Sequence, residues 1–255
     1  MRSEYTHVVS ILGTAETGKT CFLTSLYLLL TNRKLLPEWR FAGSRTLQGF
    51  EHRARHLRNW DEQGIPEQIV DRTLRNMTRS PAYLHLAAER NKRRFNFLMT
   101  DLPGEWTERL VADATTAERF GFLGRSDLIL LTLDARRFED LRTRHGERQA
   151  AIQLFQRLIQ DVGLPLGTPL LLVGTKCDET NGIVPDSLAT LAKEANAVGF
   201  ACDLIGTASF SRDLEVLPHG HGVGEVLGAV VAPRERLHDA TVAPKCTRSF
   251  LRVLR

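Results

Sequence analysis

The stretch "ILGTAETGKTCFLTSLYLLL", residues 11–30, joins the end of an apolar strand, a short loop bounded by glycines, and an apolar helix. Its centre, Gly13–Thr20, fits the pattern G-x-x-x-x-G-K-[ST], in which backbone N–H groups surround phosphate oxygens. The run "HVVSIL" (7–12) predicts a buried strand before it, and the helix at 18–30 adds its positive end. This context predicts a phosphate-binding loop. Its binding candidates are Gly13, Thr14, Ala15, Glu16, Thr17, Gly18, Lys19, Thr20 and Cys21.

Two side chains of this loop have distinct predicted roles. The ammonium of Lys19 would neutralise charge on the β- and γ-phosphates, which makes it a catalytic as well as a binding candidate. The hydroxyl of Thr20 would ligate a Mg²⁺ ion at the same phosphates. The loop therefore predicts a nucleotide with Mg²⁺, and the base must be identified from other parts of the chain.

The amino-acid composition limits the classes of protein to which the sequence can belong. The 255 residues are 42% hydrophobic, enough to bury the core of one α/β domain or of one domain with a large insertion. The formal charge of +4 is too small to indicate a nucleic-acid binder by itself. Four scattered cysteines without a CxxC pair argue against a zinc site and favour a reducing compartment. With no signal pattern and no apolar run of about 18 residues, we expect a cytoplasmic protein.

The second half of the chain alternates strands with helices. Continuous apolar runs at 126–134 and 168–176 are typical of parallel strands covered on both faces. Helical stripes at 147–163 and 185–199 each end in glycine, and 200–209 predicts one more strand before a helix near 223–231. This alternation predicts an α/β fold with a doubly wound, mostly parallel sheet.

The segment between the first helix and residue 100 is more irregular. A short extended piece at 41–43 precedes Ser44, which we expect to cap a helix running to about residue 60. The runs "AYLHLAA" (82–88) and "RFNFLMT" (94–100) predict a hairpin with a basic tip. The apolar stripe of the expected helix comprises Leu47, Phe50, Ala54 and Leu57.

A second motif follows the hairpin. "MTDLPGEW" (99–106) ends a predicted strand with Asp101, and Gly104 comes three residues later. An acid at that position can hold Mg²⁺ through a water, and the glycine N–H can meet a γ-phosphate as the loop closes. Asp-x-Pro-Gly is also an ordinary turn sequence, so the motif gains its weight from its order after the phosphate loop.

The base is indicated by "LLLVGTKCD" (170–178). Thr175 and Lys176 close a buried strand, and the carboxylate of Asp178 can accept two hydrogen bonds from the N–H edge of guanine. Adenine has no matching pair of donors and would leave a buried carboxylate unpaired. The motif therefore favours guanine over adenine.

A fourth piece, "GTASF" (206–210), ends the next predicted strand. A backbone N–H there can meet the guanine oxygen, which makes Ala208 and Ser209 binding candidates.

Together the four motifs resemble the translation-factor and Ras-related class of GTPases over most of residues 6–232. "FAGSRTLQGFE", "DLPGEW" and "FLGRSDLILLTLD" resemble bacterial double-GTPase-type proteins more closely. The resemblance implies a P-loop NTPase three-layer sandwich in a G domain at 1–232, with a family-specific insertion at about 32–80 and a basic tail at 233–255. It also implies GTP or GDP with Mg²⁺ as ligands, and a role in bacterial multi-component systems.

Lys19 and Asp101 lie 82 residues apart, about twice the gap in a compact member of the class. The enlarged segment before the switch II strand should contain the first switch, whose threonine ligates Mg²⁺ and senses the γ-phosphate. Thr78 is the preferred catalytic and metal candidate, with Thr73 and Ser80 as alternatives. Arg72, Arg75 and Arg79 are candidates to supply a positive charge to the reaction from within the same chain. The alternative is that they form an ordinary basic surface.

Glu105 takes the place where many relatives carry a glutamine that orients the attacking water. A carboxylate accepts a hydrogen bond from water but cannot donate one to the transition state, and it repels the γ-phosphate. We therefore expect slow intrinsic GTP hydrolysis that a partner accelerates.

Three functions remain open from sequence alone. The leading one is a GTP-binding switch read by a protein effector or an activating partner, with a homodimer as a further arrangement. An ATP-dependent enzyme and a pseudo-GTPase that binds nucleotide structurally are the alternatives. Residues 33–94 carry 14 basic against 7 acidic side chains, which fits a solvated face, an acidic partner, a membrane surface or RNA; contact with nucleic acid or a membrane stays open.

Overall fold

The computed structural model describes residues 5–32, 36–58 and 82–232. Thr73, Thr78, Ser80 and the arginines considered with them lie outside these ranges. The expected basic tail at 233–255 does so too.

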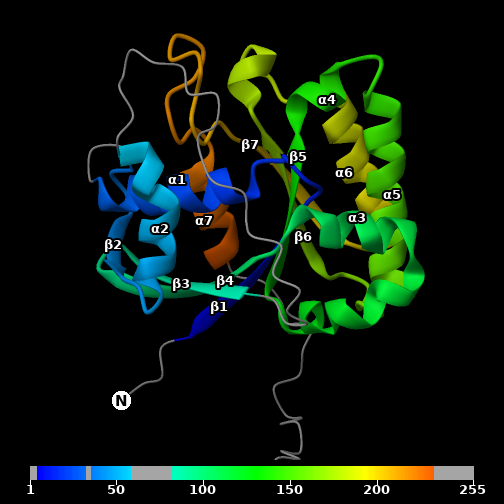
Figure 1. Ribbon diagram of the computed structural model, residues 1–255, viewed down its shortest axis with the longest axis horizontal. Helices are drawn as coiled ribbons and strands as arrows, with labels where there is room; N and C mark the ends of the chain where they lie inside the picture. The colour runs from blue at the N-terminus through cyan, green and yellow to red at the C-terminus, as the bar shows by residue number, and fades with distance from the viewer. Residues whose placement is uncertain (1–4, 33–35, 59–81, 233–255) are drawn as a thin grey trace, which may run out of the picture.

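The protein is built on a seven-stranded sheet in the order β2-β3-β4-β1-β5-β6-β7 (Figure 1). Four neighbouring strand pairs, from β4 to β7 across the central β1, run parallel. The parallel strands are β1 (Thr6–Leu12), β4 (Arg93–Asp101), β5 (Leu128–Asp134), β6 (Pro169–Thr175) and β7 (Ala201–Gly206).

The other edge of the sheet is antiparallel. β3 (Ala82–Arg90) pairs with β4 along its whole length, and β2 (Arg40–Gly43) pairs with β3. Asn91 and Lys92 join β3 to β4 with φ angles of 51° and 61°, the left-handed geometry of a two-residue hairpin turn. The hairpin predicted from the sequence is confirmed.

Helices cover both faces of the sheet, as Figure 1 shows. One face carries α1 (Lys19–Thr31), α2 (Leu47–Arg58) and α7 (Val223–Val231). The opposite face carries α3 (Gly104–Ala112), α5 (Arg144–Gln160) and α6 (Asp186–Val198). Shorter elements complete the fold: η1 (Ala114–Arg125), α4 (Ala135–Glu139) and η2 (Cys177–Thr180).

Two hydrophobic cores result, one on each face. Along β5, Leu130 belongs to the core under α1 and α7, whereas Ile129 and Leu131 belong to the core under α5 and α6. Every residue of β5 is buried, which is why that strand reads as a continuous apolar run. The predicted α/β three-layer sandwich with a mostly parallel sheet is confirmed.

The start of α2 differs from expectation. The helix begins at Leu47, and Ser44 forms the preceding turn, where its Oγ accepts from the N–H of Thr46 at 3.0 Å and donates to the His85 carbonyl at 2.6 Å. Phe50 is buried, but Leu47 is 41% exposed because the first residue of the helix lies beyond the covered part of the core.

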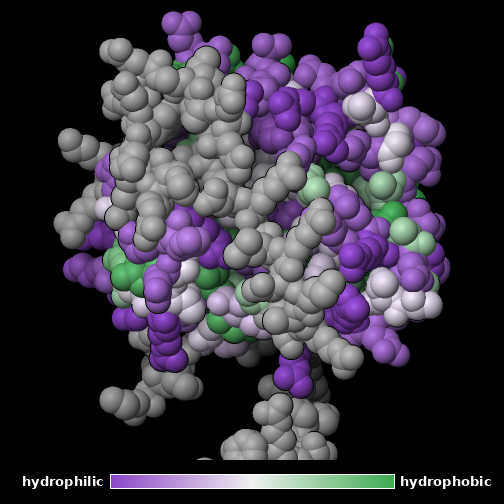
Figure 2. Space-filling view, in the orientation of Figure 1, coloured by the Kyte–Doolittle hydropathy of each residue, from purple (hydrophilic) through white to green (hydrophobic). Residues whose placement is uncertain are grey.

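The face drawn in Figure 2 gives few signs of an apolar interface where its residues are described. The described part of the face in Figure 2 is mainly hydrophilic, with hydrophobic residues in small separate groups. Trp106 is buried, and its ring packs in a T-shaped arrangement with that of Phe120, with 6.3 Å between centroids. Within residues 5–32, 36–58 and 82–232, no helix is both long and apolar enough to span a bilayer.

The core under α5 gives a test of the fold. Phe155 is fully buried, and its ring lies 5.8 Å from that of Phe200. We expect Phe155→Ala to lower the free energy of unfolding by about 3–5 kcal/mol through lost burial and a cavity. Urea unfolding measures it, with the exposed Leu141→Ala as control. Equal stability of the two variants would contradict the packing described.

Candidate functional site

The candidate site lies at the carboxyl ends of the parallel strands, where loops from distant parts of the sequence meet. Residues 13–20 follow β1, residues 101–106 run from the last residue of β4 into α3, and residues 134–137 run from the last residue of β5 into α4. Residues 175–178 end β6, and residues 207–209 follow β7. The fold thus brings the sequence-predicted motifs together at one edge of the sheet.

The phosphate loop turns sharply at Gly13. Its φ angle is +147°, and a Cβ there would lie 2.3 Å from Thr132 Oγ1 and 2.6 Å from Thr17 Oγ1. Those two hydroxyls are themselves hydrogen-bonded at 2.9 Å beneath the loop. Glycine is therefore required for the loop to close on the end of β5.

Lys19 begins α1 and folds back over the loop. Its Nζ donates to the carbonyl oxygens of Gly13 at 2.8 Å and Thr14 at 2.6 Å, and the residue is 8% exposed. Burial lowers the pKa of Lys19 to about 8, against the opposing effect of nearby carboxylates, of which Asp101 contributes most. The ammonium is therefore held in the concave side of the loop, where it can meet an anion.

Helix α3 closes on one side of the phosphate loop. A Cβ on Gly104 would lie 2.4 Å from the nitrogen of Ala15, so the D-x-x-G turn and the loop are in direct backbone contact. The N–H of Ala15 donates to Glu108 Oε1 at 2.8 Å, and that of Gly13 donates to Thr107 Oγ1 at 3.3 Å. Neither side-chain contact was predicted from the sequence, because no sequence pattern in α3 indicates them.

Asp101 ends β4 with a buried carboxylate that forms an ion pair with Arg53 of α2. Arg53 also donates from Nη1 to the Gly49 carbonyl at 2.7 Å, which fixes the guanidinium along its own helix. No sequence pattern marks this pair, because its members lie 48 positions apart on elements whose relative placement was unknown. Glu105, the predicted catalytic carboxylate, is half-buried in the first turn of α3.

The other side of the loop is held by the end of β6. The Thr175 hydroxyl lies 3.0 Å from the carbonyl oxygen of Thr17 and 3.1 Å from that of Leu133. Lys176 adopts a left-handed φ of 62° and donates from Nζ to the Glu16 carbonyl at 3.0 Å. These contacts attach the T-K-x-D motif directly to the phosphate loop.

Asp178 is buried in η2, where its Oδ2 accepts from the N–H of Arg212 at 2.8 Å. The loop after β7 is thereby drawn over the T-K-x-D motif. In that loop the N–H of Ala208 donates to the His221 carbonyl at 3.1 Å, so this amide already has a partner. The Ser209 Oγ is buried without a hydrogen-bond partner among the described residues.

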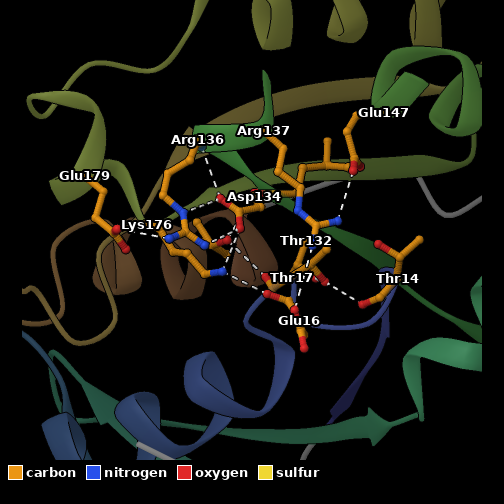
Figure 3. A network of polar contacts seen from close by, with 12 residues as sticks. Thr14, Glu16, Thr17, Thr132, Asp134, Arg136, Arg137, Glu147, Lys176 and Glu179 are labelled. Carbon is orange, nitrogen blue, oxygen red and sulfur yellow. Dashed lines mark hydrogen bonds and ion pairs between the residues drawn. The ribbon is translucent and has the colours of Figure 1, made fainter. Parts of the chain in front are cut away.

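A polar network that the sequence analysis did not identify surrounds Asp134 at the end of β5 (Figure 3). The Asp134 side chain is 1% exposed; its Oδ2 accepts from Lys176 Nζ at 2.6 Å and Arg136 Nη2 at 2.8 Å. Arg136 Nη1 continues to Glu179 Oε2 at 3.0 Å. The sequence signal that could have identified Asp134 is an acidic residue at the end of a buried apolar strand, a position that Asp101 also occupies.

The second arginine of the network reaches the phosphate loop. Arg137 Nη2 lies 3.8 Å from Glu16 Oε2, and its Nη1 donates to Glu147 Oε1 of α5 at 3.0 Å. Figure 3 shows Arg137 between these carboxylates, next to Asp134. The loop at Glu16 is therefore supported by Arg137 of α4, which Glu147 of α5 holds in turn, and by Lys176 at the end of β6.

The network gives a pH-dependent prediction. Burial acts to raise the pKa of Asp134, but hydrogen bonds and charge from Arg136 and Lys176 outweigh it and lower the pKa. We expect Asp134→Asn to lower the free energy of unfolding by about 1–3 kcal/mol at pH 7. Because the pKa of Asp134 is lower in the folded than in the unfolded protein, its ionised carboxylate stabilises the fold above the unfolded-state pKa of about 3.9. This stabilisation is lost as the pH falls through the folded-state pKa.

The deficit of the Asp134→Asn variant should therefore shrink below about pH 4. Urea unfolding at several pH values measures it, with the exposed Asp203→Asn as the matched control. A deficit that is constant down to about pH 3, or no deficit at all, would show that the network does not depend on the charge of Asp134.

Several solved structures resemble this chain. They include the G domain of the T. maritima FeoB iron transporter, with 16% identity, a TM-score of 0.44, and coverage of 89% of this chain and 98% of that one. Methanosarcina barkeri Roco2 RocCORdC bound to GDP has 15% identity and a TM-score of 0.44, with coverage of 88% and 47%. A mutation variant of SsGBP has 15% identity and a TM-score of 0.45, with coverage of 89% and 56%.

The chain thus spans about half the length of the second and third of these proteins. No curated protein matches the sequence at a significant level. A family model, Double-GTPase 2, matches residues 7–231, which include all five loops of the candidate site. The chain belongs to the Double-GTPase 2 family of GTP-binding GTPases.

Proposed function

We propose that this GTPase is a molecular switch that hydrolyses GTP to GDP slowly on its own and faster with a protein partner. In this proposal it serves as a regulatory component of a bacterial multi-protein system, read by an effector or by a second copy of the chain. The observation that carries the proposal is the attachment of the T-K-x-D motif to the phosphate loop through Lys176 and Thr175. One ligand can contact both motifs at once only if they are held together in this way.

Guanine selection is assigned to Asp178. Its carboxylate is buried at the carboxyl end of β6, and a guanine N–H edge offers two donors to such a group. Adenine offers no equivalent pair, so the carboxylate would keep its bond from the Arg212 N–H but lack the donors that guanine adds, which is costly for a buried charge. Lys176 would lie along the base, while Ser209, whose Oγ is buried without a described partner, supplies a further polar group.

Phosphate binding is assigned to Lys19 and to the N–H groups of residues 13–20, which also meet the positive end of α1. Mg²⁺ suits the donors present, because Thr20 and Asp101 offer oxygen atoms and the phosphates and water complete its shell. Bound Mg²⁺ would neutralise charge developing on the phosphates.

Asp101 would have to exchange its ion pair with Arg53 for a water on Mg²⁺. We assign the remaining metal ligand, the threonine of the first switch, to Thr78 as the sequence suggests. Glu105 would face the attacking water, and its carboxylate cannot donate the hydrogen bond that a glutamine provides.

A structural role for the nucleotide is the second candidate. It is favoured by the Ala208 amide, which is already bonded to His221, and by the carboxylate at position 105. In that case GDP and GTP would both stabilise the fold, and no turnover would be measured.

Base selection can be tested by isothermal titration of the purified chain with GDP, GTP and ATP in the presence of Mg²⁺. We expect guanine nucleotides to bind and ATP to bind at least about 100-fold more weakly, because adenine lacks the two donors that guanine adds to the buried carboxylate of Asp178. Asp178→Ala should lose that preference, whereas Asp203→Asn should keep it.

Asp178→Asn provides a matched gain of function. It replaces one acceptor by an N–H donor, so it should favour xanthosine diphosphate, which carries a carbonyl where guanine has its amino group. ATP binding equal to that of GTP, or guanine preference that survives Asp178→Ala, would refute base recognition by this residue.

Hydrolysis is the second test. Single-turnover phosphate release from bound GTP should occur at a rate on the order of 10⁻³ s⁻¹ or below, as for G domains without an activating partner. We expect Glu105→Gln to raise this rate, since the amide can donate to the transition state. Many turnovers per second by the unmodified chain would contradict the need for a partner, and complete absence of phosphate release would favour the structural role.

A further inference from the structure

The first two turns of α3 lie against the phosphate loop through one face of the helix. Gly104, Thr107 and Glu108 share that face, as positions three and four apart on a helix do. Gly104 packs on the backbone of Ala15, and the Glu108 carboxylate takes the N–H of Ala15 at 2.8 Å. A carboxylate of the protein itself, that of Glu108, thus binds a backbone N–H of the phosphate loop.

The contacts of the loop distinguish its two sides. On the side of Glu16 and Thr17, the backbone carbonyls are held by Lys176 and Thr175, next to the proposed base site. On the opposite side, Ala15 meets the D-x-x-G turn, whose glycine N–H is the group that meets a terminal phosphate in this kind of site. In the proposed site, Ala15 therefore lies at the end of the loop where a γ-phosphate, and not the base or ribose, would be bound.

The Ala15 end of the phosphate loop already has negatively charged side chains of the protein near it. The carboxylates of Asp101, Glu108 and Glu105 all act on Lys19, where they oppose the effect of burial on its pKa. A γ-phosphate that arrives beside Lys19 and Ala15 meets both an occupied N–H and a like charge. GDP ends at the β-phosphate and leaves the Glu108 contact in place.

We propose that Glu108 is a specificity-determining residue that competes with the γ-phosphate of GTP for the N–H of Ala15 and so favours GDP over GTP. The inference rests on the proposed function, because it concerns the same nucleotide site. GTP binding then requires the Glu108 side chain to leave the loop. The first two turns of α3 therefore respond to the γ-phosphate through this residue as well as through Gly104.

The test compares dissociation constants for GDP and for the non-hydrolysable GTP analogue GppNHp, by isothermal titration of the full chain with Mg²⁺. Glu108→Ala should lower the ratio of the GppNHp constant to the GDP constant by about tenfold, the usual effect of one charge-assisted hydrogen bond. The change should come from tighter GppNHp binding, with the GDP constant within about twofold of the unmodified chain.

Two further variants sharpen the comparison. Glu108→Gln should give an intermediate ratio, because its amide oxygen still accepts from Ala15 but no longer repels a phosphate. Glu118→Ala removes an exposed carboxylate from the neighbouring η1 and should leave the ratio unchanged. The Glu108 side chain is also exposed, so both variants at position 108 are expected to fold, and their thermal unfolding checks this.

An unchanged ratio in Glu108→Ala would overturn the inference while leaving guanine nucleotide binding intact. An equal change in both constants would also overturn it, since Glu108 would then act on the shape of the loop and not on the γ-phosphate. If neither nucleotide binds to the unmodified chain, the proposed function itself fails, and the role of Glu108 fails with it.

Discussion

Lys176 joins the two halves of the candidate site. Its ammonium donates to the Glu16 carbonyl in the phosphate loop and to the buried carboxylate of Asp134, while its own backbone leads into the segment that carries Asp178. The left-handed backbone of Lys176 turns the chain from β6 into η2 at this point. The segments proposed for base recognition and for phosphate binding therefore share one support, and Asp134 fixes the ammonium that holds them together.

On the opposite side of the phosphate loop, two charged side chains of the protein occupy positions that charges of a ligand could take. Glu108 provides an anion on an amide of the loop, and Arg53 provides a cation on the carboxylate of Asp101. GTP with Mg²⁺ would bring its γ-phosphate to the first position and a cation near the second. Both internal partners would then be released, which couples occupation of the site to α2 and α3 at the same time.

The sequence was sufficient for the fold and for the contiguous motifs, because each of them is encoded locally. The buried run of β5 reveals a covered parallel strand, and the glycines of residues 13–18 specify a tight loop before a helix. Arg53, Asp134 and Glu108 could not be assigned in the same way. Their partners are set by how α2, β5 and α3 dock, and a single charged residue on a helix reads as a solvated side chain until its neighbours are known.

The packing of α3 decides how far the site can respond to a ligand. Trp106, Thr107 and Leu110 are buried beneath the helix, whereas Glu108 is exposed on the side that meets the loop. Lifting the whole helix would expose that apolar surface, but rotating one glutamate side chain exposes none of it. A γ-phosphate would therefore first displace Glu108 and rearrange the turn at Gly104, and the body of α3 would stay packed on its core.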